Sequence, residues 1–265
     1  MPQPMIDRVD VAIVFALDLE AAPLRDRLQD AVRLQARDTA VTTGRLGDRT
    51  VAIAVAGMGK VAARATRQVI DGHRPGAVIA AGLCGGLSPD LARGTLVVAD
   101  RVAHVASATR PPTMSPGGGR DQLAAAGPVG LTLPDPAALE RLSCAVARGL
   151  VVTADAVVAT PDAKRTLADE TGAIAVDMES WWIVDEALQS GRPVGVVRAV
   201  SDTVDTAIPA DIARLAGMPH AMRRVGAAMR LLWRRPGAIV ELAELRDQAH
   251  RVADDLAARL AELVA

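Results

Sequence analysis

A chain of 265 residues, half of them apolar, is long enough to form one large domain with a sizeable core. Its formal net charge of −1 provides no global field that would favour nucleic acid or another strongly charged partner. With one phenylalanine, three tryptophans and no tyrosine, the chain also lacks the exposed rings of a stacking platform for single-stranded nucleic acid.

Cysteine usage and hydropathy bear on the cellular compartment. Cys84 and Cys144 do not have the spacing of metal ligands, and a disulfide between them remains an open alternative. Two cysteines in a chain of this length are typical of a cytosolic protein. No opening segment has the pattern of a secretory signal, and no apolar run reaches about 18 residues. We therefore expect a soluble, cytoplasmic protein.

Short apolar runs, typical of buried strands, alternate along the chain with helical patterns. The expected strands are Val9–Leu17, Thr50–Ala56, Ala77–Gly82, Gly94–Val102, Gly149–Ala154, Ala173–Asp177 and Pro193–Val200. The expected helices are Ala21–Asp30, Val61–Asp71, Pro161–Thr171 and Ser180–Ser190. This alternation predicts an α/β fold, in which a mixed but largely parallel central sheet is flanked by helices.

Two segments depart from the alternation. Ala106–Asp135 is rich in proline and contains the run Gly117–Gly119, which predicts a long surface loop or a cover over an active site. Beyond Ile208 no strand pattern remains, and Met218–Arg235 and Ala238–Val264 are expected as helices. The sequence thus predicts a main domain of residues 1–209 and a helical C-terminal extension of residues 210–265 packed on it.

Ligands of open α/β sheets bind at the carboxyl ends of the strands, so the residues that follow each strand are candidates for a site. Glu20 follows the first strand. It is either a carboxylate that faces a ligand or a charge at the N-terminus of a helix. Gly57–Ala62 matches a dinucleotide fingerprint, but the acid expected about 20 positions later is missing. It is either a tight turn or backbone that passes close to a sugar. The glycines of Gly82–Leu87 serve either packing or the approach of a ligand to the backbone.

The two most informative strand ends carry acids. One reads Val176-Asp177-Met178-Glu179, and the other reads Val197-Arg198-Ala199-Val200-Ser201-Asp202. The aliphatic run before Asp202 indicates a partly desolvated carboxyl group, whose pKa would rise from about 3.9 toward neutrality, as suits a general acid. The alternative is that Ser201 or Asp202 caps a following turn. Cys84 has no histidine nearby in the sequence and is not expected to act as a nucleophile.

Together these segments resemble the nucleoside phosphorylase superfamily, and in particular the methylthioadenosine/S-adenosylhomocysteine nucleosidases. The resemblance runs from about Val11 to Pro209, with the two acidic strand ends as its most specific pieces. Thr43-Gly44-Arg45-Leu46 and the two glycine-rich segments support it. It implies a nucleoside phosphorylase-like fold and an enzyme that cleaves the N-glycosidic bond of a purine nucleoside, without a metal or organic cofactor.

The resemblance also implies a role for each matched residue. Asp202 would protonate N7 of the purine, with Ser201 orienting it, and Glu20 would activate the attacking water. Glu179 would hold the ribose hydroxyls while Met178 packs against the sugar. The remaining candidates fall into two groups. Lining the ribose and nucleophile side would be Met58, Leu83, Cys84 and Gly85. Bordering the base would be Val157 and Val158. Val157 stands where the nucleosidases usually have a phenylalanine, and Leu83 replaces a hydroxyl residue.

Three functions fit these residues. The first is hydrolysis of a 5′-modified adenosine, with release of adenine. The second is phosphorolysis of adenosylhopane or a related nucleoside in hopanoid biosynthesis, with inorganic phosphate as co-substrate. The hopanoid-associated phosphorylases resemble this chain in Val176–Ser180, in an aliphatic residue at Leu83 and in a tail like Arg234-Arg235-Pro236-Gly237. The third is a nucleoside-binding protein without catalytic activity.

The expected partners are a small nucleoside and further copies of the chain. The resemblance implies a homodimer or a larger homo-oligomer. Trp181 and Trp182 point about 100° apart on a helix, so we expect one of them in the core or at a subunit interface. Ala221–Arg235 has a basic amphipathic pattern, which predicts either peripheral membrane contact or docking on the protein itself. No nucleic acid partner is expected.

Overall fold

The computed structural model describes residues 8–36, 39–105, 137–142, 144–210, 213 and 238–265. The loop expected at Ala106–Asp135 and the helix expected at Met218–Arg235 lie outside the described residues. None of the described helices is long and apolar enough to span a membrane.

The described chain is an α/β structure with a central sheet of nine strands, in the order β2-β3-β4-β1-β5-β8-β7-β6-β9. The strands are β1 (Val11–Phe15), β2 (Gln29–Ala36), β3 (Thr39–Leu46), β4 (Arg49–Val55), β5 (Ala77–Gly86), β6 (Leu96–Val105), β7 (Val146–Ala154), β8 (Ala175–Asp177) and β9 (Val194–Asp202). Parallel and antiparallel pairs occur together, so the predicted mixed α/β fold is confirmed.

The sheet closes on itself at one end. Strand β9 pairs with β6 in the antiparallel sense and with β5 in the parallel sense, so β5, β8, β7, β6 and β9 form a ring. The register between β5 and β9 shifts where Cys84 pairs with Val200 but Gly85 pairs with Asp202. Ser201 is therefore the additional residue of a β-bulge, which changes the side to which the following side chain points.

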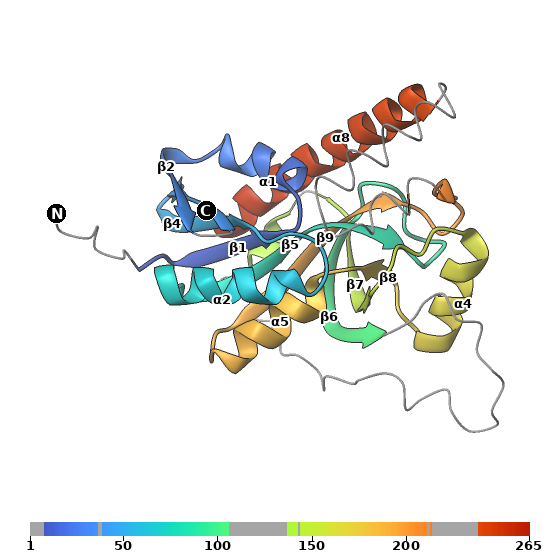
Figure 1. Cartoon of the computed structure of the whole chain (residues 1–265), viewed down its shortest axis with the longest axis horizontal. Helices are drawn as coiled ribbons and strands as arrows, with labels where there is room; N and C mark the ends of the chain where they lie inside the picture. Colours follow the sequence, from blue (N-terminus) through green and yellow to red (C-terminus); the bar gives the residue numbers. More distant parts are fainter. Residues whose placement is uncertain (1–7, 37–38, 106–136, 143, 211–212, 214–237) are drawn as a thin grey trace.

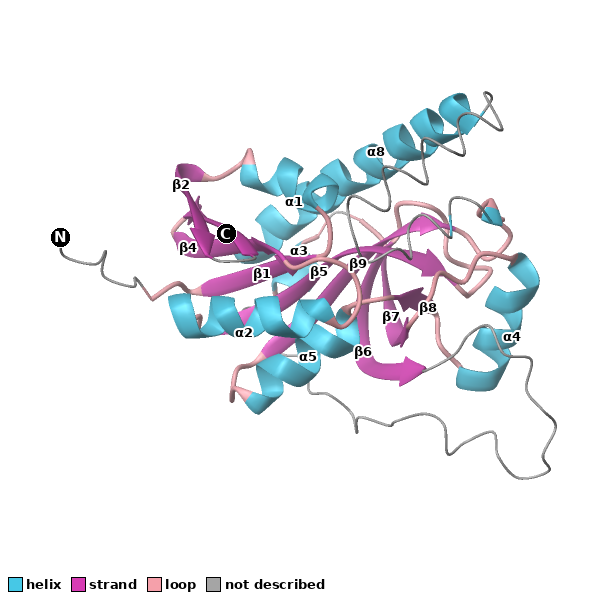
Figure 2. Ribbon diagram, in the orientation of Figure 1, coloured by secondary structure: helices cyan, strands magenta, loops and turns pink. Residues whose placement is uncertain are grey.

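Helices cover both faces of the sheet (Figures 1 and 2). They are α1 (Asp18–Arg25), α2 (Val61–His73), α3 (Ala138–Arg141), α4 (Pro161–Thr171), α5 (Ser180–Gln189) and α8 (Ala238–Val264). One hydrophobic core joins α2 and α5 to the sheet, and another joins α1 and α8 to the opposite face. Val252, Leu256 and Leu260 of α8 are buried in this second core. The predicted domain boundary after residue 209 stays a prediction.

The N-terminal region differs from the sequence prediction. The helix expected over Ala21–Asp30 begins at Asp18 and ends at Arg25, and the chain from Gln29 onward forms β2 instead. This strand pairs with β3 in a hairpin that the sequence did not predict. Val32 and Leu34 on β2 are 54% and 40% exposed, so the hairpin lacks the continuous apolar run by which the buried strands were found.

Helix α4 shows how local sequence signals position a buried charge. Thr160 caps its N-terminus by accepting a hydrogen bond from the Ala163 N–H at 3.2 Å, and Pro161 occupies the first turn. Gly172 ends the helix with φ of 68°, a conformation that favours glycine. Lys164 and Leu167, three positions apart, are both buried. One lysine of this helix therefore faces the protein interior rather than solvent.

Candidate active site

A pocket of about 170 Å³ lies where several strands of the sheet end. Its lining comes from the segments after β1, β4 and β7 and from the ends of β5, β8 and β9. The structure brings all of the residues predicted from the sequence together here: Glu20, Met58, Leu83, Cys84, Gly85, Val157, Val158, Met178, Glu179, Ser201 and Asp202. The described residues that line the pocket include no lysine, arginine or histidine.

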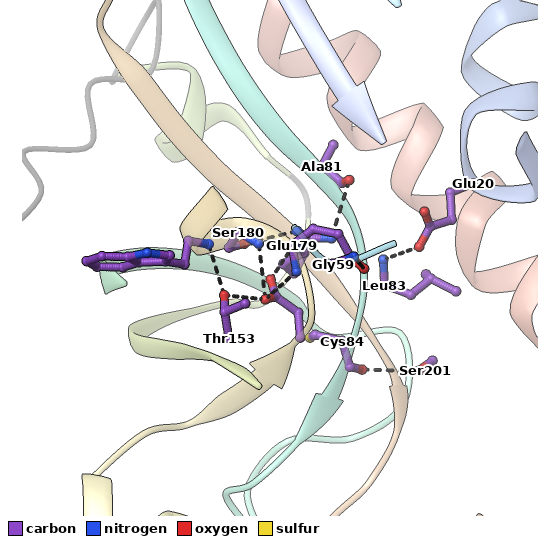
Figure 3. Close-up of polar contacts among 12 residues, drawn as sticks. Glu20, Gly59, Ala81, Leu83, Cys84, Thr153, Glu179, Ser180 and Ser201 are labelled. Carbon is purple, nitrogen blue, oxygen red and sulfur yellow. Dashed lines mark hydrogen bonds and ion pairs between the residues drawn. The ribbon is translucent and has the colours of Figure 1, made fainter. Parts of the chain in front are cut away.

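Glu20 lies in the first turn of α1 and is 4% exposed. One carboxyl oxygen accepts a hydrogen bond from the Leu17 N–H at 2.9 Å. The other accepts one from the Leu83 N–H at 2.9 Å, which Figure 3 shows. Burial raises the pKa of Glu20, although the positive charge of Arg198 and these backbone N–H groups act in the opposite direction. Glu20 thus accepts a hydrogen bond at the N-terminus of α1 and also lines the pocket.

Glu179 stands at the N-terminal end of α5 and is 6% exposed. Its Oε1 accepts a hydrogen bond from the Gly59 N–H at 3.0 Å, with Gly59 at φ of 71°. The Gly57–Ala62 turn therefore directs a backbone N–H to an acid of the pocket. Burial raises the pKa of Glu179 to about 8, despite the opposing charge of Arg198. The carboxyl group is consequently largely protonated at neutral pH and can donate a hydrogen bond as well as accept one.

Arg198, whose sequence motif was noted without a role for its side chain, lies fully buried behind the pocket. Its guanidinium contacts Asp177 Oδ2 at 2.9 Å as an ion pair without hydrogen-bond geometry. It also donates hydrogen bonds to Ser180 Oγ at 3.1 and 3.0 Å. The charges of Asp177, Glu179 and Glu20 all raise the pKa of Arg198, against the effect of burial. The guanidinium is thus in contact with one carboxylate, Asp177, and acts on the two glutamates only through its charge.

Two further residues hold this arrangement in place. Asp177 Oδ1 accepts hydrogen bonds from Thr153 Oγ1 at 2.7 Å and from the Glu179 and Ser180 N–H groups at 3.2 Å. Asp177 thereby fixes the start of α5, at which Glu179 stands. Gly82 has φ of 149°, and a Cβ there would lie 2.5 Å from the Arg198 guanidinium, so a glycine is required for this close approach.

Asp202 ends β9 next to the bulge at Ser201, so two consecutive side chains line the pocket. Asp202 Oδ1 lies 2.6 Å from Ser201 Oγ. Figure 3 shows the second contact of this hydroxyl, 3.1 Å from the Cys84 carbonyl oxygen. The Thr203 N–H at the following turn donates to Thr206 Oγ1 at 3.2 Å. Ser201 and Asp202 therefore face the pocket, and a threonine accepts the hydrogen bond at the turn that they were considered to cap.

The site contains a charged residue that the sequence prediction missed. Lys164 of α4 is fully buried, and its Nζ lies 2.5 Å from Asp202 Oδ2. The predicted partial desolvation of Asp202, whose side chain is 16% exposed, is therefore accompanied by an ion pair. The signal in the sequence is the spacing of Lys164 and Leu167, which places the lysine on the buried side of its helix.

The cysteines do not contribute a nucleophile or a disulfide. Cys84 and Cys144 are both free. Cys84 is 3% exposed, and burial strongly raises the pKa of its thiol, so little thiolate forms at neutral pH. Among the described residues, no cluster of three or more histidine, cysteine, aspartate or glutamate side chains could hold a metal ion.

A family model described as the phosphorylase superfamily matches residues 10–265. The chain belongs to this superfamily. Three solved structures share the fold of this superfamily member. The first is a 5′-methylthioadenosine/S-adenosylhomocysteine nucleosidase from Neisseria meningitidis in complex with methylthio-immucillin-A, at 22% identity, with 96% of this chain and 98% of that chain covered and a TM-score of 0.68.

The second is an S-adenosylhomocysteine nucleosidase from Streptococcus pyogenes, at 22% identity, with 98% of each chain covered and a TM-score of 0.70. The third is a futalosine hydrolase from Helicobacter pylori, at 18% identity, with 98% of each chain covered and a TM-score of 0.69. Membership in the phosphorylase superfamily, together with the pocket described above, identifies the chain as an enzyme that cleaves the N-glycosidic bond of a nucleoside.

Proposed function

We propose that this enzyme hydrolyses a 5′-modified adenosine of the methylthioadenosine/S-adenosylhomocysteine type and releases adenine. The observation that carries the proposal is the convergence of Glu20, Glu179 and Asp202 on one pocket, to which the described residues contribute no cationic side chain. The similar solved structures include nucleosidases that are named for these two substrates, which supports the same substrate class for this chain.

On the base side of the pocket, Asp202 donates a proton to N7 of the purine as the bond between C1′ and N9 breaks. The electron pair of that bond passes to the base, which would otherwise leave as an unstable anion. Proton transfer from a positioned acid contributes about 10²–10⁴-fold to such a rate. As the proton departs, the Ser201 hydroxyl turns from the Cys84 carbonyl toward Asp202 Oδ1, because both acceptors are within its reach.

On the sugar side, the ribose gains cationic character, which nearby carboxyl groups stabilise. Glu179 contacts the ribose hydroxyls, and in its protonated form it donates one hydrogen bond and accepts another. A water molecule attacks C1′ and gives a proton to Glu20, whose raised pKa makes it a better base. Asp202 loses one proton and Glu20 gains one, so the products are adenine and the free sugar.

Water is favoured over phosphate by the charges around the pocket. Phosphate carries about two negative charges and calls for cationic hydrogen-bond donors. Arg198 forms an ion pair with Asp177, and Lys164 forms one with Asp202, so both cations are already paired. The competing proposal is phosphorolysis of adenosylhopane or a related nucleoside. Its support is the resemblance to the hopanoid-associated phosphorylases at Leu83, an aliphatic residue that lines the pocket.

One experiment separates the candidate functions. The protein is incubated with methylthioadenosine, S-adenosylhomocysteine, adenosine, adenosylhopane and inosine, with and without phosphate, and free base and sugar products are measured. We expect adenine release without phosphate, and loss of that release in Asp202→Asn. Phosphate-dependent formation of a sugar 1-phosphate establishes phosphorolysis instead. Ligand binding without any base release establishes a non-catalytic binding protein, and release from inosine alone refutes the preference for adenine.

We also propose two partners besides the substrate. The first is a further copy of the chain, bound through the face that carries Trp181 and Trp182, which sedimentation of a Trp181→Ala variant tests.

The second is a membrane surface, contacted peripherally by the C-terminal segment Ala221–Arg235. Because α8 is part of the core, this contact is tested by replacing arginines of that segment with glutamate in the full chain. If the fraction of protein that floats with anionic liposomes is the same with and without the replacements, membrane contact is refuted.

A further inference from the structure

Lys164 is an unusual lysine because its side chain is fully buried. A buried ammonium group is costly unless its hydrogens and its charge are matched. Its Nζ donates hydrogen bonds to Asp202 Oδ2 at 2.5 Å, to the Thr203 carbonyl oxygen at 2.7 Å and to the Thr206 carbonyl oxygen at 3.0 Å. All three hydrogens therefore have acceptors, and the only carboxylate among these acceptors is the proposed general acid.

This geometry determines which oxygen of Asp202 can carry a proton. A lysine ammonium group has three donors and no acceptor. Oδ2 must therefore accept from Lys164, and a proton on that oxygen would face another donor. When Asp202 is protonated, the proton consequently resides on Oδ1, the oxygen that lies 2.6 Å from Ser201 Oγ. Lys164 thus occupies Oδ2 and leaves Oδ1, which also contacts Ser201, to serve the base.

The same contact matters again after the proton has moved. Asp202 becomes a carboxylate when the base departs, in a pocket whose described lining contains no cationic side chain. Arg198 forms its ion pair with Asp177 instead. Lys164 is the cation in contact with Asp202, so it stabilises the charge that forms as the proton is transferred.

We propose that Lys164 is a positioning residue for the general acid: it directs the transferable proton of Asp202 to Oδ1 and stabilises the carboxylate that remains. This role rests on the proposed function, in which Asp202 protonates the leaving base. This role requires no contact between Lys164 and the nucleoside. The contribution of Lys164 therefore lies in the chemical step rather than in substrate binding.

The test compares Lys164→Met, Lys164→Arg and a matched control, Arg165→Met. Arg165 is the next residue of α4, is exposed, and forms an ion pair with Asp205 of the same loop that Lys164 contacts. We expect Lys164→Met to lower kcat about 10- to 100-fold, which is part of the gain from general acid catalysis, while KM stays within about threefold. Lys164→Arg, which keeps the charge, should lower kcat by less than about threefold, and Arg165→Met should leave it unchanged.

Further measurements separate positioning from a structural role. In the Asp202→Asn background, Lys164→Met should lower the residual rate by less than about twofold, because the group on which Lys164 acts is already absent. If Lys164→Met does not fold, Lys164→Gln takes its place, since an amide still donates to the two carbonyls but has no charge. A wild-type kcat in the uncharged variant overturns the proposal. So does an equal loss of kcat in a folded Lys164→Arg, or a loss that appears entirely in KM.

The failure of this inference and the failure of the proposed function give different results. If the wild-type protein releases no base, or if Asp202→Asn remains fully active, the proposed function is refuted whatever Lys164 does. If the wild type is active and Asp202→Asn is not, while Lys164→Met behaves like the wild type, Lys164 is a structural residue and the function of Asp202 stands.

Discussion

Glu179 provides a test that links the electrostatics of the site to stability. The pKa of Glu179 is raised from its ordinary value of 4.5 to about 8, chiefly by burial. Between these values the folded protein keeps a proton that the unfolded chain has lost, so the free energy of unfolding falls as the pH rises. This contribution is fully present below about pH 4.5 and is lost by about pH 8. A difference of about 3.5 (8 − 4.5) corresponds to about 5 kcal/mol.

Glu179→Gln isolates this contribution because the amide is neutral at every pH and keeps an oxygen for the Gly59 N–H. We expect the variant and the wild type to be about equally stable at pH 5, and the variant to be more stable by up to about 5 kcal/mol at pH 9. Urea unfolding across this range measures both proteins, with Glu170→Gln as an exposed-glutamate control. Parallel pH profiles for the wild type and Glu179→Gln would refute the argument.

Three other substitutions have defined outcomes. Asp177→Asn removes the acid in contact with the buried Arg198. Denaturant unfolding should therefore show that the free energy of unfolding falls by about 3–5 kcal/mol, and a fall below about 1 kcal/mol contradicts the buried ion pair. Gly82→Ala places a Cβ 2.5 Å from that guanidinium at φ of 149°, so both the melting temperature and kcat should fall, and an unchanged kcat contradicts the requirement for glycine. Val157→Phe adds a ring beside the base. In steady-state assays it should lower KM for an adenine nucleoside about fivefold, which corresponds to about 1 kcal/mol of binding free energy. A higher KM contradicts a stacking position.

The predictable part of the fold is the part that is buried on both sides. The runs that became β1 and β5 contain no charged residue, and β9 is apolar except for Arg198 until it reaches Ser201, a composition typical of strands inside a covered sheet. The sequence did not predict the β2–β3 hairpin because β2 mixes exposed apolar residues such as Val32 with polar ones. It therefore lacks the continuous apolar run that marks a buried strand. The ring of five strands could not be predicted either, because it depends on β9 pairing with two strands at once.

The site divides in the same way between local and distant relations. The acids at strand ends were recognisable because a carboxylate directly after an apolar strand is placed by that strand alone. Arg198 was part of a recognised motif, but its neighbours Asp177 and Glu20 come from other elements, so its role as a shared cation depends on tertiary structure. Lys164 lies 38 positions before Asp202, and a lysine in a helix is more often solvated than buried.

The placement of the two buried cations explains how one pocket can release a proton on one side and hold one on the other. Burial keeps the proton on Glu179 at neutral pH, because the positive charge of Arg198, which also acts on Asp177 and Glu20, opposes the effect of burial only in part. Among the acids that the structure describes, Lys164 pairs with Asp202 alone, so the carboxylate that forms there is matched by a full positive charge. A shared cation therefore suits the side that grips the sugar and accepts a proton from water. An unshared cation suits the side that gives a proton to the base.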